Sequence, residues 1–260
     1  MSDQNKKTYQ SASIVRYYTQ LKRLQPAEQA ILARFKEQLP CLKMLDIGVG
    51  GGRTTHHFAP LVRDYTGIDY SAEMVAACQQ RFSPSPYSMT LEVGDARNMK
   101  QFADNTFDFV LFSFNGIDYV SHGDRLQILR EIHRVGKPGG YFFFSSHNLQ
   151  GIAQEFGYRT KIRLNPFKSY VNLVMLALLK LFNPAISRDR LETADYLIIK
   201  DEPHNFRLLN YYIRPTAQIN QLALNFNSIE VYSWQSGRRL DINELSTNTD
   251  MWLYYLCVFN

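Results

Sequence analysis

Apolar and polar positions follow two alternating patterns along most of this 260-residue chain. From residue 43 onward, short apolar runs such as "KMLDIG" and "FDFVLFSF" indicate buried strands. The stretches after them carry apolar residues three or four positions apart, as amphipathic helices do. Regular alternation of strand and helix predicts a parallel sheet covered by helices on both faces. Because ligands bind beyond the carboxyl ends of such strands, we expect functional residues in the loops that follow them.

The same pattern gives approximate bounds for the elements. Strands are expected at 43–48, 64–70, 88–96, 107–114, 140–146, 206–213, 228–234 and 252–259. Helices are expected at 26–39, 53–61, 71–82, 122–135, 170–182 and 215–226. The last two strands are separated by a polar loop, and we expect them to form an antiparallel pair that closes a mixed sheet.

Four segments emerge from this order of elements. Residues 1–40 form an N-terminal helical segment, 41–148 the core, 149–205 an inserted cap with substrate contacts, and 206–260 the completion of the core sheet. The cap interrupts the alternation with polar turns around an apolar, helix-like stretch.

The apolar stretch in the cap, "YVNLVMLALLKLF", is shorter than the roughly 20 residues that a bilayer span needs. Helical spacing gathers five apolar residues on one face: Tyr170, Leu173, Val174, Ala177 and Leu181. A face of this kind is typical of a packed cap helix, which is the interpretation we favour. A wall of an apolar acceptor pocket and a contact with a membrane surface are the alternatives.

Composition is that of a globular enzyme, with 45% hydrophobic and 20% charged residues. The formal net charge is +5, but Lys and Arg are spread along the chain, which does not favour a nucleic-acid partner. The three cysteines contain no CxxC pair, so neither a disulfide framework nor a zinc site is predicted. Free thiols and a polar N-terminus without a signal peptide predict a cytoplasmic protein.

The segment "LDIGVGGGR" places Gly48, Gly50 and Gly52 directly after the first core strand. Glycines lack a Cβ atom, so they tolerate positive φ and let backbone amides approach a ligand closely. A tight strand-to-helix turn without a ligand is the alternative, but the cluster favours ligand binding. Dinucleotide-binding folds use a similar loop, so the glycine spacing alone does not name the ligand.

Asp46, two residues before Gly48, belongs to the same motif as the glycines, and three further motifs narrow the choice of ligand. Asp69 stands in "GIDYSAEM" at the end of the next strand, "GDA" spans 94–96 and "KPGG" spans 137–140. In this order the motifs resemble those of class I S-adenosylmethionine-dependent methyltransferases, over roughly residues 33–146. The resemblance implies an α/β, doubly wound, seven-stranded, mostly parallel sheet of the Rossmann-like methyltransferase fold, with N-terminal helices and an inserted cap. It also implies S-adenosyl-L-methionine as the cofactor.

The matched positions are assigned cofactor contacts by this resemblance. Asp69 would accept hydrogen bonds from both ribose hydroxyls, and Tyr70 would lay its ring on the adenine face. Asp95 would accept from the adenine amino group while the amide of Ala96 donates to a ring nitrogen. Asp46 would orient the glycine loop and the amino-acid end of the cofactor. Each of these residues has a structural alternative, as a cap, a turn residue or a packing residue.

Three more candidates lie nearby. Arg53 would pair with the cofactor carboxylate or stand as a solvated first-turn residue. Ser113 and Asn115, at the end of the fourth strand, would hold the amino-acid moiety of the cofactor or the substrate.

His147 is the candidate general base, because it follows the fifth strand and imidazole accepts a proton near neutral pH. A structural, hydrogen-bonded role is the alternative. His122, His204, His56 and His57 are weaker candidates. Four tyrosines are considered as pocket residues: Tyr17, Tyr18, Tyr211 and Tyr212.

The predicted function is methyl transfer to an oxygen or nitrogen atom of a small molecule. No NPPY-like or Pro-Cys sequence follows the fourth strand, which disfavours nucleic-acid bases and protein glutamine as acceptors. Asp118 and Asp124 do not make a convincing metal cluster, so no metal is assigned. A nicotinamide-dependent oxidoreductase and a non-catalytic S-adenosylmethionine-binding protein are the alternatives. The sequence does not indicate an oligomeric state.

Overall fold

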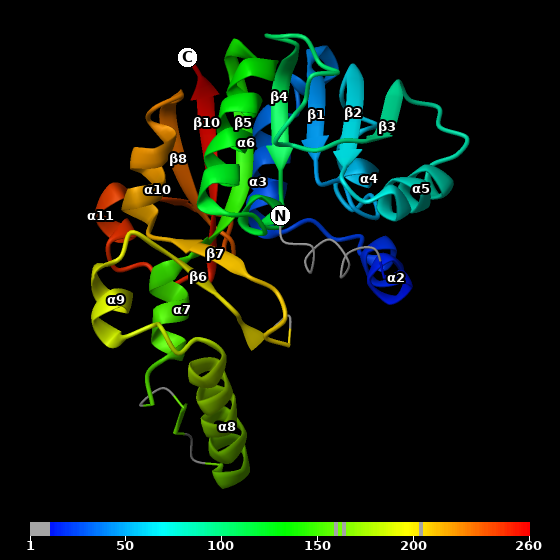
Figure 1. The fold of residues 1–260 in the computed structure, drawn as a ribbon. Helices are drawn as coiled ribbons and strands as arrows, with labels where there is room; N and C mark the ends of the chain where they lie inside the picture. The colour runs from blue at the N-terminus through cyan, green and yellow to red at the C-terminus, as the bar shows by residue number, and fades with distance from the viewer. Residues whose placement is uncertain (1–10, 159–160, 163–164, 203–204) are drawn as a thin grey trace.

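The computed structural model describes residues 11–158, 161–162, 165–202 and 205–260, and is built around one sheet (Figure 1). In this part of the chain ten strands pair: β1 (Lys43–Ile47), β2 (Asp64–Asp69), β3 (Met89–Val93), β4 (Phe107–Phe112), β5 (Gly136–Asn148), β6 (Tyr196–Ile199), β7 (Asn210–Ile213), β8 (Phe226–Ser233), β9 (Arg239–Leu240) and β10 (Trp252–Phe259).

The order of strands across the sheet is β3-β2-β1-β4-β5-β10-β8-β9. The first five are mutually parallel, and β10 runs antiparallel to both β5 and β8. The predicted mostly parallel sheet and its closing antiparallel pair are therefore confirmed. The sheet has ten strands rather than the seven that the resemblance implied, because three short strands, among them β7 within the expected strand 206–213, extend a core of seven. These are β9 at one edge and the hairpin of β6 and β7, which joins the end of β5 through His147 and Asn148.

Helices connect the strands and flank the sheet. The described residues contain α2 (Ala12–Gln20), α3 (Pro26–Phe35), η1 (Leu39–Cys41), α4 (Thr55–Phe58), α5 (Ala72–Arg81), η2 (Gly116–Asp118), α6 (His122–Val135), α7 (Leu149–Glu155), α8 (Pro166–Phe182), α9 (Arg188–Thr193), α10 (Pro215–Leu222) and α11 (Ile242–Leu245).

Alternate side chains of the buried strands feed two separate cores. In β5, Phe142 and Phe144 pack with residues of α6 and α10 on one face of the sheet. Phe143 points to the other face, where it joins residues of α3, α4 and α5. Side chains of a strand alternate between the two faces, so a run of consecutive apolar residues is what a sheet covered on both sides requires.

Local sequence signals set several helix starts. The hydroxyl of Ser71 accepts a hydrogen bond from the Met74 amide, so Ser71 caps α5 as predicted. Pro26 occupies the first turn of α3, where a missing amide hydrogen carries no penalty. The helix expected at 53–61 is only Thr55–Phe58, because turns occupy the residues on either side of it. The "KPGG" segment is not a separate turn; it lies inside β5, where Gly139 has a φ of +77°.

The predicted cap residues contribute α7, α8, α9 and β6 to a third hydrophobic cluster that includes Leu149, Ile152, Leu191 and Leu197. Figure 1 shows α8 at the end of the molecule farthest from the sheet. Among the described residues, no helix combines the length and the apolar character needed to cross a membrane.

The orientation of α8 differs from the expected one. Leu176 and Leu179 are buried in the cap, whereas Tyr170 and Leu181 on the opposite face are 66% and 70% exposed. The expectation that the Tyr170 face packs against the body is therefore wrong. Both faces of this helix are apolar, so the sequence pattern did not distinguish the packed face from the exposed one.

Two leucines of α8 test this orientation. Replacing buried Leu179 with Ala should lower the free energy of unfolding by about 2–5 kcal/mol, since it leaves a cavity in the cap. The matched Leu181→Ala variant should change it by less than about 0.5 kcal/mol, because that side chain is exposed. Urea unfolding followed by circular dichroism measures both, and equal losses would contradict the orientation.

Candidate cofactor-binding site

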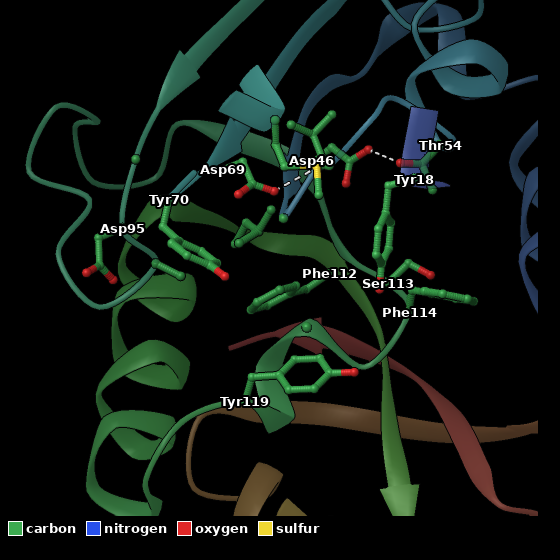
Figure 2. A pocket seen from close by; sticks show the side chains of 18 of the residues that line it. Tyr18, Asp46, Thr54, Asp69, Tyr70, Asp95, Phe112, Ser113, Phe114 and Tyr119 are labelled. Atoms are coloured by element: carbon green, nitrogen blue, oxygen red, sulfur yellow. Dashed lines mark hydrogen bonds between the residues drawn. The ribbon is translucent and has the colours of Figure 1, made fainter. Parts of the chain in front are cut away.

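A cavity of about 500 Å³ lies at the carboxyl ends of β1 to β4. Its walls are the glycine loop after β1, the Asp69–Tyr70 corner after β2, residues 93–97 after β3 and the segment after β4. Tyr18 from α2 closes one side. Figure 2 shows Asp95 and Tyr70 at one end of the cavity, Tyr18 and Phe114 at the other, and Phe112 between them. A ligand in the cavity could contact residues from four loops, each of which follows one strand of the sheet.

The glycine loop is bent by residues in the left-handed region. Gly48, Gly50 and Gly52 have φ values of +69°, +53° and +80°, which side chains with a Cβ atom adopt only under strain. The amide of Gly50 donates to Asp69 Oδ2 at 2.9 Å and so ties the loop to the end of β2. Gly51 has another function, because a Cβ atom there would lie 2.5 Å from the Thr19 backbone nitrogen of α2.

Asp69 is held by backbone amides on both carboxylate oxygens. Oδ1 accepts from the Ser71 amide and Oδ2 from the Gly50 amide, each at 2.9 Å. Burial raises the pKa of Asp69 to about 6, although these two hydrogen bonds act in the opposite direction. Each oxygen keeps a further lone pair, so the carboxylate can still accept hydrogen bonds from a ligand in the cavity.

Asp46 also lines the cavity and is bound from within the protein. Its Oδ2 accepts from Thr54 Oγ1 and from Tyr65 Oη, both at 2.5 Å. Figure 2 shows the Asp46–Thr54 contact as a dashed line. Burial raises the pKa of Asp46 to about 6 against these hydrogen bonds. Thr54 lies two residues after Gly52, so this contact fixes the position of the last residues of the glycine loop.

Asp95, Ala96 and Tyr70 line the cavity beside the end of β3. The carboxylate of Asp95 accepts from the Arg97 amide at 2.9 Å and from its guanidinium Nη2 at 2.7 Å. Arg97 thereby holds the turn in place, while Asp95 itself is only partly buried. The turn lies where the sequence predicted adenine contacts.

Arg53 lines the cavity, but its guanidinium already has a carboxylate partner within the protein. Nη1 and Nη2 lie 2.5 and 2.7 Å from the two carboxylate oxygens of Glu28 in α3. The guanidinium also lies 4.9 Å from the ring centre of Phe114. This arrangement excludes the solvated alternative for Arg53, since the residue is only 8% exposed. Arg53 could therefore pair with the cofactor carboxylate only if Glu28 moved away or if the two carboxylates shared the guanidinium.

Glu28 was not predicted as a site residue. It is fully buried, and its Oε1 accepts from Ser113 Oγ and, at 3.0 Å, from Tyr254 Oη. The sequence did carry a signal, because Glu28 lies on the same face of α3 as the buried residues Ala27, Ile31 and Phe35. A buried acid needs a cation or hydrogen-bond donors beside it, and Arg53 supplies both to Glu28.

Ser113 lines the cavity, whereas Gly52 and Asn115 do not. A Cβ atom on Gly52 would lie 2.4 Å from Phe82 Cε2, so this glycine makes room for α5. Asn115 is buried with a φ of +60°, and its backbone amide donates to Ser145 Oγ at 2.7 Å. The geometry gives both residues a structural function, and a direct contact with the cofactor stays a prediction for them.

His147 does not line the cavity either. Its Nδ1 lies 2.8 Å from Asp118 Oδ2, and its Nε2 lies 3.2 Å from Asn115 Nδ2. Asp118 in turn is fully buried, pairs with Arg125 and accepts from the His147 amide at 2.6 Å. The ring of Tyr119, centred 6.4 Å away, packs edge-on against the imidazole. His147 is therefore part of a buried polar network next to the cavity.

Aromatic side chains line the end of the cavity near β4. Tyr18 and Phe114 meet edge to face with ring centres 6.4 Å apart, and Tyr119 and Phe112 complete the wall. Of these, only Tyr18 was considered from the sequence. Gly116 contributes by leaving room, because a Cβ atom there would lie 2.3 Å from Phe112 Cε2.

The remaining candidates lie elsewhere. His122 stacks on Tyr196 at 4.3 Å and its Nδ1 lies 2.8 Å from Tyr211 Oη, while His57 Nε2 lies 2.7 Å from the Lys22 carbonyl oxygen. None of the candidates Tyr17, Tyr211, Tyr212, His56, His57 and His122 lines the cavity. His204 is outside the described residues. Within the described ranges, no group of three or more His, Cys, Asp or Glu residues could hold a metal ion.

The donors and acceptors of the cavity match the groups of S-adenosylmethionine. The carboxylate of Asp69 suits ribose hydroxyls, the Asp95–Ala96 turn suits the edge of a purine, and the glycine loop suits a close backbone approach. The aromatic wall suits an apolar methyl group and a sulfonium cation. The residues present therefore fit this cofactor.

The buried Glu28–Arg53 pair gives a stability prediction. Glu28→Gln leaves the Arg53 guanidinium buried and unpaired, so the free energy of unfolding should fall by about 3–5 kcal/mol. Glu28→Gln combined with Arg53→Met removes both charges and should be more stable than Glu28→Gln alone. Urea unfolding tests both, with Glu192→Gln of the exposed Arg188–Glu192 pair as a control that should match wild type. A double variant less stable than the single one would contradict this assignment.

Comparisons with known proteins agree with the fold. The family described as "Methyltransferase domain" matches residues 44–140. The ubiquinone/menaquinone biosynthesis C-methyltransferase UbiE of Geotalea daltonii is 37% identical over 103 residues, which are 38% of this chain and 42% of that protein. A demethylmenaquinone methyltransferase of Lysinibacillus sphaericus is 36% identical over 104 residues, 39% of this chain and 42% of that protein. The aligned parts thus span less than half the length of these curated relatives.

Among solved structures, the methyltransferase CcbJ of Streptomyces caelestis superimposes with a TM-score of 0.62 at 15% identity. The alignment covers 97% of this chain and 98% of that one, so the likeness in fold extends well beyond the matched domain. The cavity lies between loops of the matched residues, and Tyr18 of α2 is added from outside them. Residues 44–140 are therefore similar to a methyltransferase domain, and the chain as a whole has the fold of a solved methyltransferase.

Proposed function

We propose that this chain is an S-adenosylmethionine-dependent methyltransferase that acts on a small, largely apolar molecule. The observation that carries the proposal is the single cavity that joins Asp69 and the Asp95–Ala96 turn at one end to aromatic side chains at the other. One end offers the polar partners of a nucleoside, and the other offers the surroundings of an apolar acceptor.

The bound cofactor would supply an electrophilic methyl group on a sulfonium sulfur, so the protein's task is alignment and exclusion of water. In this proposal Asp69 accepts from the ribose, and the Asp95–Ala96 turn selects the purine. Asp46 fixes the glycine loop that receives the amino-acid end. Because Glu28 pairs with Arg53, the positive charge of Arg53 in the cavity wall is largely neutralised.

The chemical class of the acceptor follows from the aromatic end of the cavity. Tyr18, Phe114 and Tyr119 favour a flat, apolar molecule through stacking and edge contacts. The sequence predicted an oxygen or nitrogen acceptor, whereas the Geotalea relative carries the name of a C-methyltransferase. The proposal therefore covers all three acceptor atoms, and NMR of the methylated product assigns the atom.

His147 stays a hypothesis as the general base. His147 does not line the cavity, so support for this role comes only from its place at the end of β5. Turnover of a His147→Gln variant equal to that of wild type would refute the hypothesis.

Binding of S-adenosylhomocysteine, measured by isothermal titration calorimetry, tests the cofactor site. Wild type should bind it, and Asp69→Ala should weaken the affinity by at least about tenfold, since hydrogen bonds to a charged acceptor are lost. Asp64→Asn, at the exposed opposite end of β2, is the matched control and should bind like wild type. Wild-type protein that prefers NAD to S-adenosylhomocysteine would overturn the proposal.

The same titrations should depend on pH. Burial raises the pKa of Asp69 and of Asp46 to about 6, so both carboxyls are ionised at pH 7.5 and become protonated as the pH falls through 6. Affinity should therefore drop about tenfold between pH 7.5 and pH 5. The Asp69→Asn variant should bind weakly at every pH and lose most of this dependence. A flat wild-type profile would contradict the assignment of Asp69 as an ionised acceptor.

A further inference from the structure

Helix α8 exposes an unusually apolar surface. Of the eighteen large apolar side chains that are exposed among the described residues, seven belong to this one helix of 17 residues. Phe167, Tyr170 and Leu181 are 73%, 66% and 70% exposed, and Val174 lies between them on the same side at helical spacing. A contiguous exposed apolar stripe of this kind marks a surface that meets another apolar phase.

The exposed stripe faces away from the body of the protein. Leu176 and Leu179, on the other side of α8, are the residues that pack into the cap cluster. Figure 1 shows α8 at the far end of the cap, with neither the sheet nor another helix on its outer side. The stripe therefore faces solvent, while the opposite side of α8 packs against the rest of the cap.

The sequence around this helix is basic, although Lys161 pairs with Glu155 and Arg188 pairs with Glu192. Between Glu155 and Asp189 the sequence contains no acidic residue but six basic ones: Arg159, Lys161, Arg163, Lys168, Lys180 and Arg188. On α8 itself, Lys168 and Lys180 are exposed, and at 100° per residue they lie on either side of the apolar stripe, about 110–130° from its centre. A basic flank on each side of an apolar face is the pattern of a helix that lies in the interface of an anionic bilayer.

We propose that α8 docks the protein onto the surface of a membrane that contains anionic lipids. The apolar stripe enters the boundary between headgroups and acyl chains, and Lys168 and Lys180 reach the phosphates beside it. The helix lies flat, because its 17 residues are shorter than a span requires. A second copy of the chain is a poorer occupant, because a two-fold contact through α8 would bring the basic residues of both copies together.

This proposal is independent of the proposed function, because its test measures binding of the full chain to vesicles without cofactor or acceptor. Flotation with vesicles of phosphatidylglycerol and phosphatidylcholine in equal parts is compared with flotation on phosphatidylcholine alone. Wild type should float with the anionic vesicles and bind the neutral ones at least about tenfold more weakly, since each flanking lysine contributes about fivefold.

Two pairs of substitutions separate the apolar and the basic contributions. Tyr170→Ser with Leu181→Ser should weaken binding by at least about tenfold, as two apolar side chains leave the interface. Lys168→Gln with Lys180→Gln should weaken binding to the anionic vesicles by about twentyfold and leave binding to neutral vesicles unchanged.

Matched controls carry the same changes elsewhere on the surface. Leu224→Ser with Ile242→Ser removes two apolar side chains that are 75% and 73% exposed, and Lys36→Gln with Lys100→Gln removes two exposed lysines. Both controls should bind like wild type, and circular dichroism checks the fold of every variant.

Three outcomes would overturn the proposal. The first is wild-type protein that floats with neither kind of vesicle. The second is a loss of binding in the control pairs as large as that in the α8 pairs. The third is a dimer, detected by light scattering, that Tyr170→Ser with Leu181→Ser dissociates, while wild type binds no vesicle.

Discussion

The buried ion pair between Glu28 and Arg53 links the parts of the molecule on which the site depends. Glu28 belongs to α3, ahead of the sheet, and Arg53 follows the glycine loop. Ser113 at the end of β4 and Tyr254 in β10 donate to the same carboxylate. Neither charge is tolerable without the other in this environment. The requirement that both be paired therefore fixes the N-terminal helix, the loop and two strands in one arrangement.

The sheet provides the second constraint. Parallel strands end at one edge, and at that edge β1, β2, β3 and β4 each contribute a loop to the cavity. The hydrogen bond from Gly50 to Asp69 joins the first two of these loops directly. A ligand that spans the cavity would then contact residues from four loops whose positions are set by strand pairing rather than by the loops' own packing.

The fold and half of the site could be predicted from the sequence because their signals are local. Apolar runs and helical spacing give the succession of strands and helices along the chain, and the glycines with Asp69 and the "GDA" turn give one wall of the cavity. The Glu28–Arg53 pair joins residues 25 positions apart, and no spacing rule couples them. The aromatic wall was missed because Phe112 and Phe114, on either side of Ser113, belong to a mainly apolar segment in which core and cavity positions look alike.

The cap shows a different limit of sequence reasoning. Helix α8 is apolar on two faces, and only the position of Leu179 in the cap cluster shows which one is covered. The His147 network shows the same limit. Its partners Asp118, Asn115 and Tyr119 come from one turn, and no sequence pattern predicts the positive φ values in that turn. In both cases the deciding information is which neighbour occupies a face, and that is a property of the folded chain.

Helix α2 closes the cavity with Tyr18, yet none of its residues is buried. The backbone of Thr19 in α2 lies against Gly51, and α2 also lies beside α5. Because α2 buries no side chain, it can separate from these neighbours without repacking a core, so the free energy that opens this wall is small compared with global unfolding. A ligand in the cavity would therefore stabilise the closed position of this wall more than that of the four loops, which strand pairing already holds.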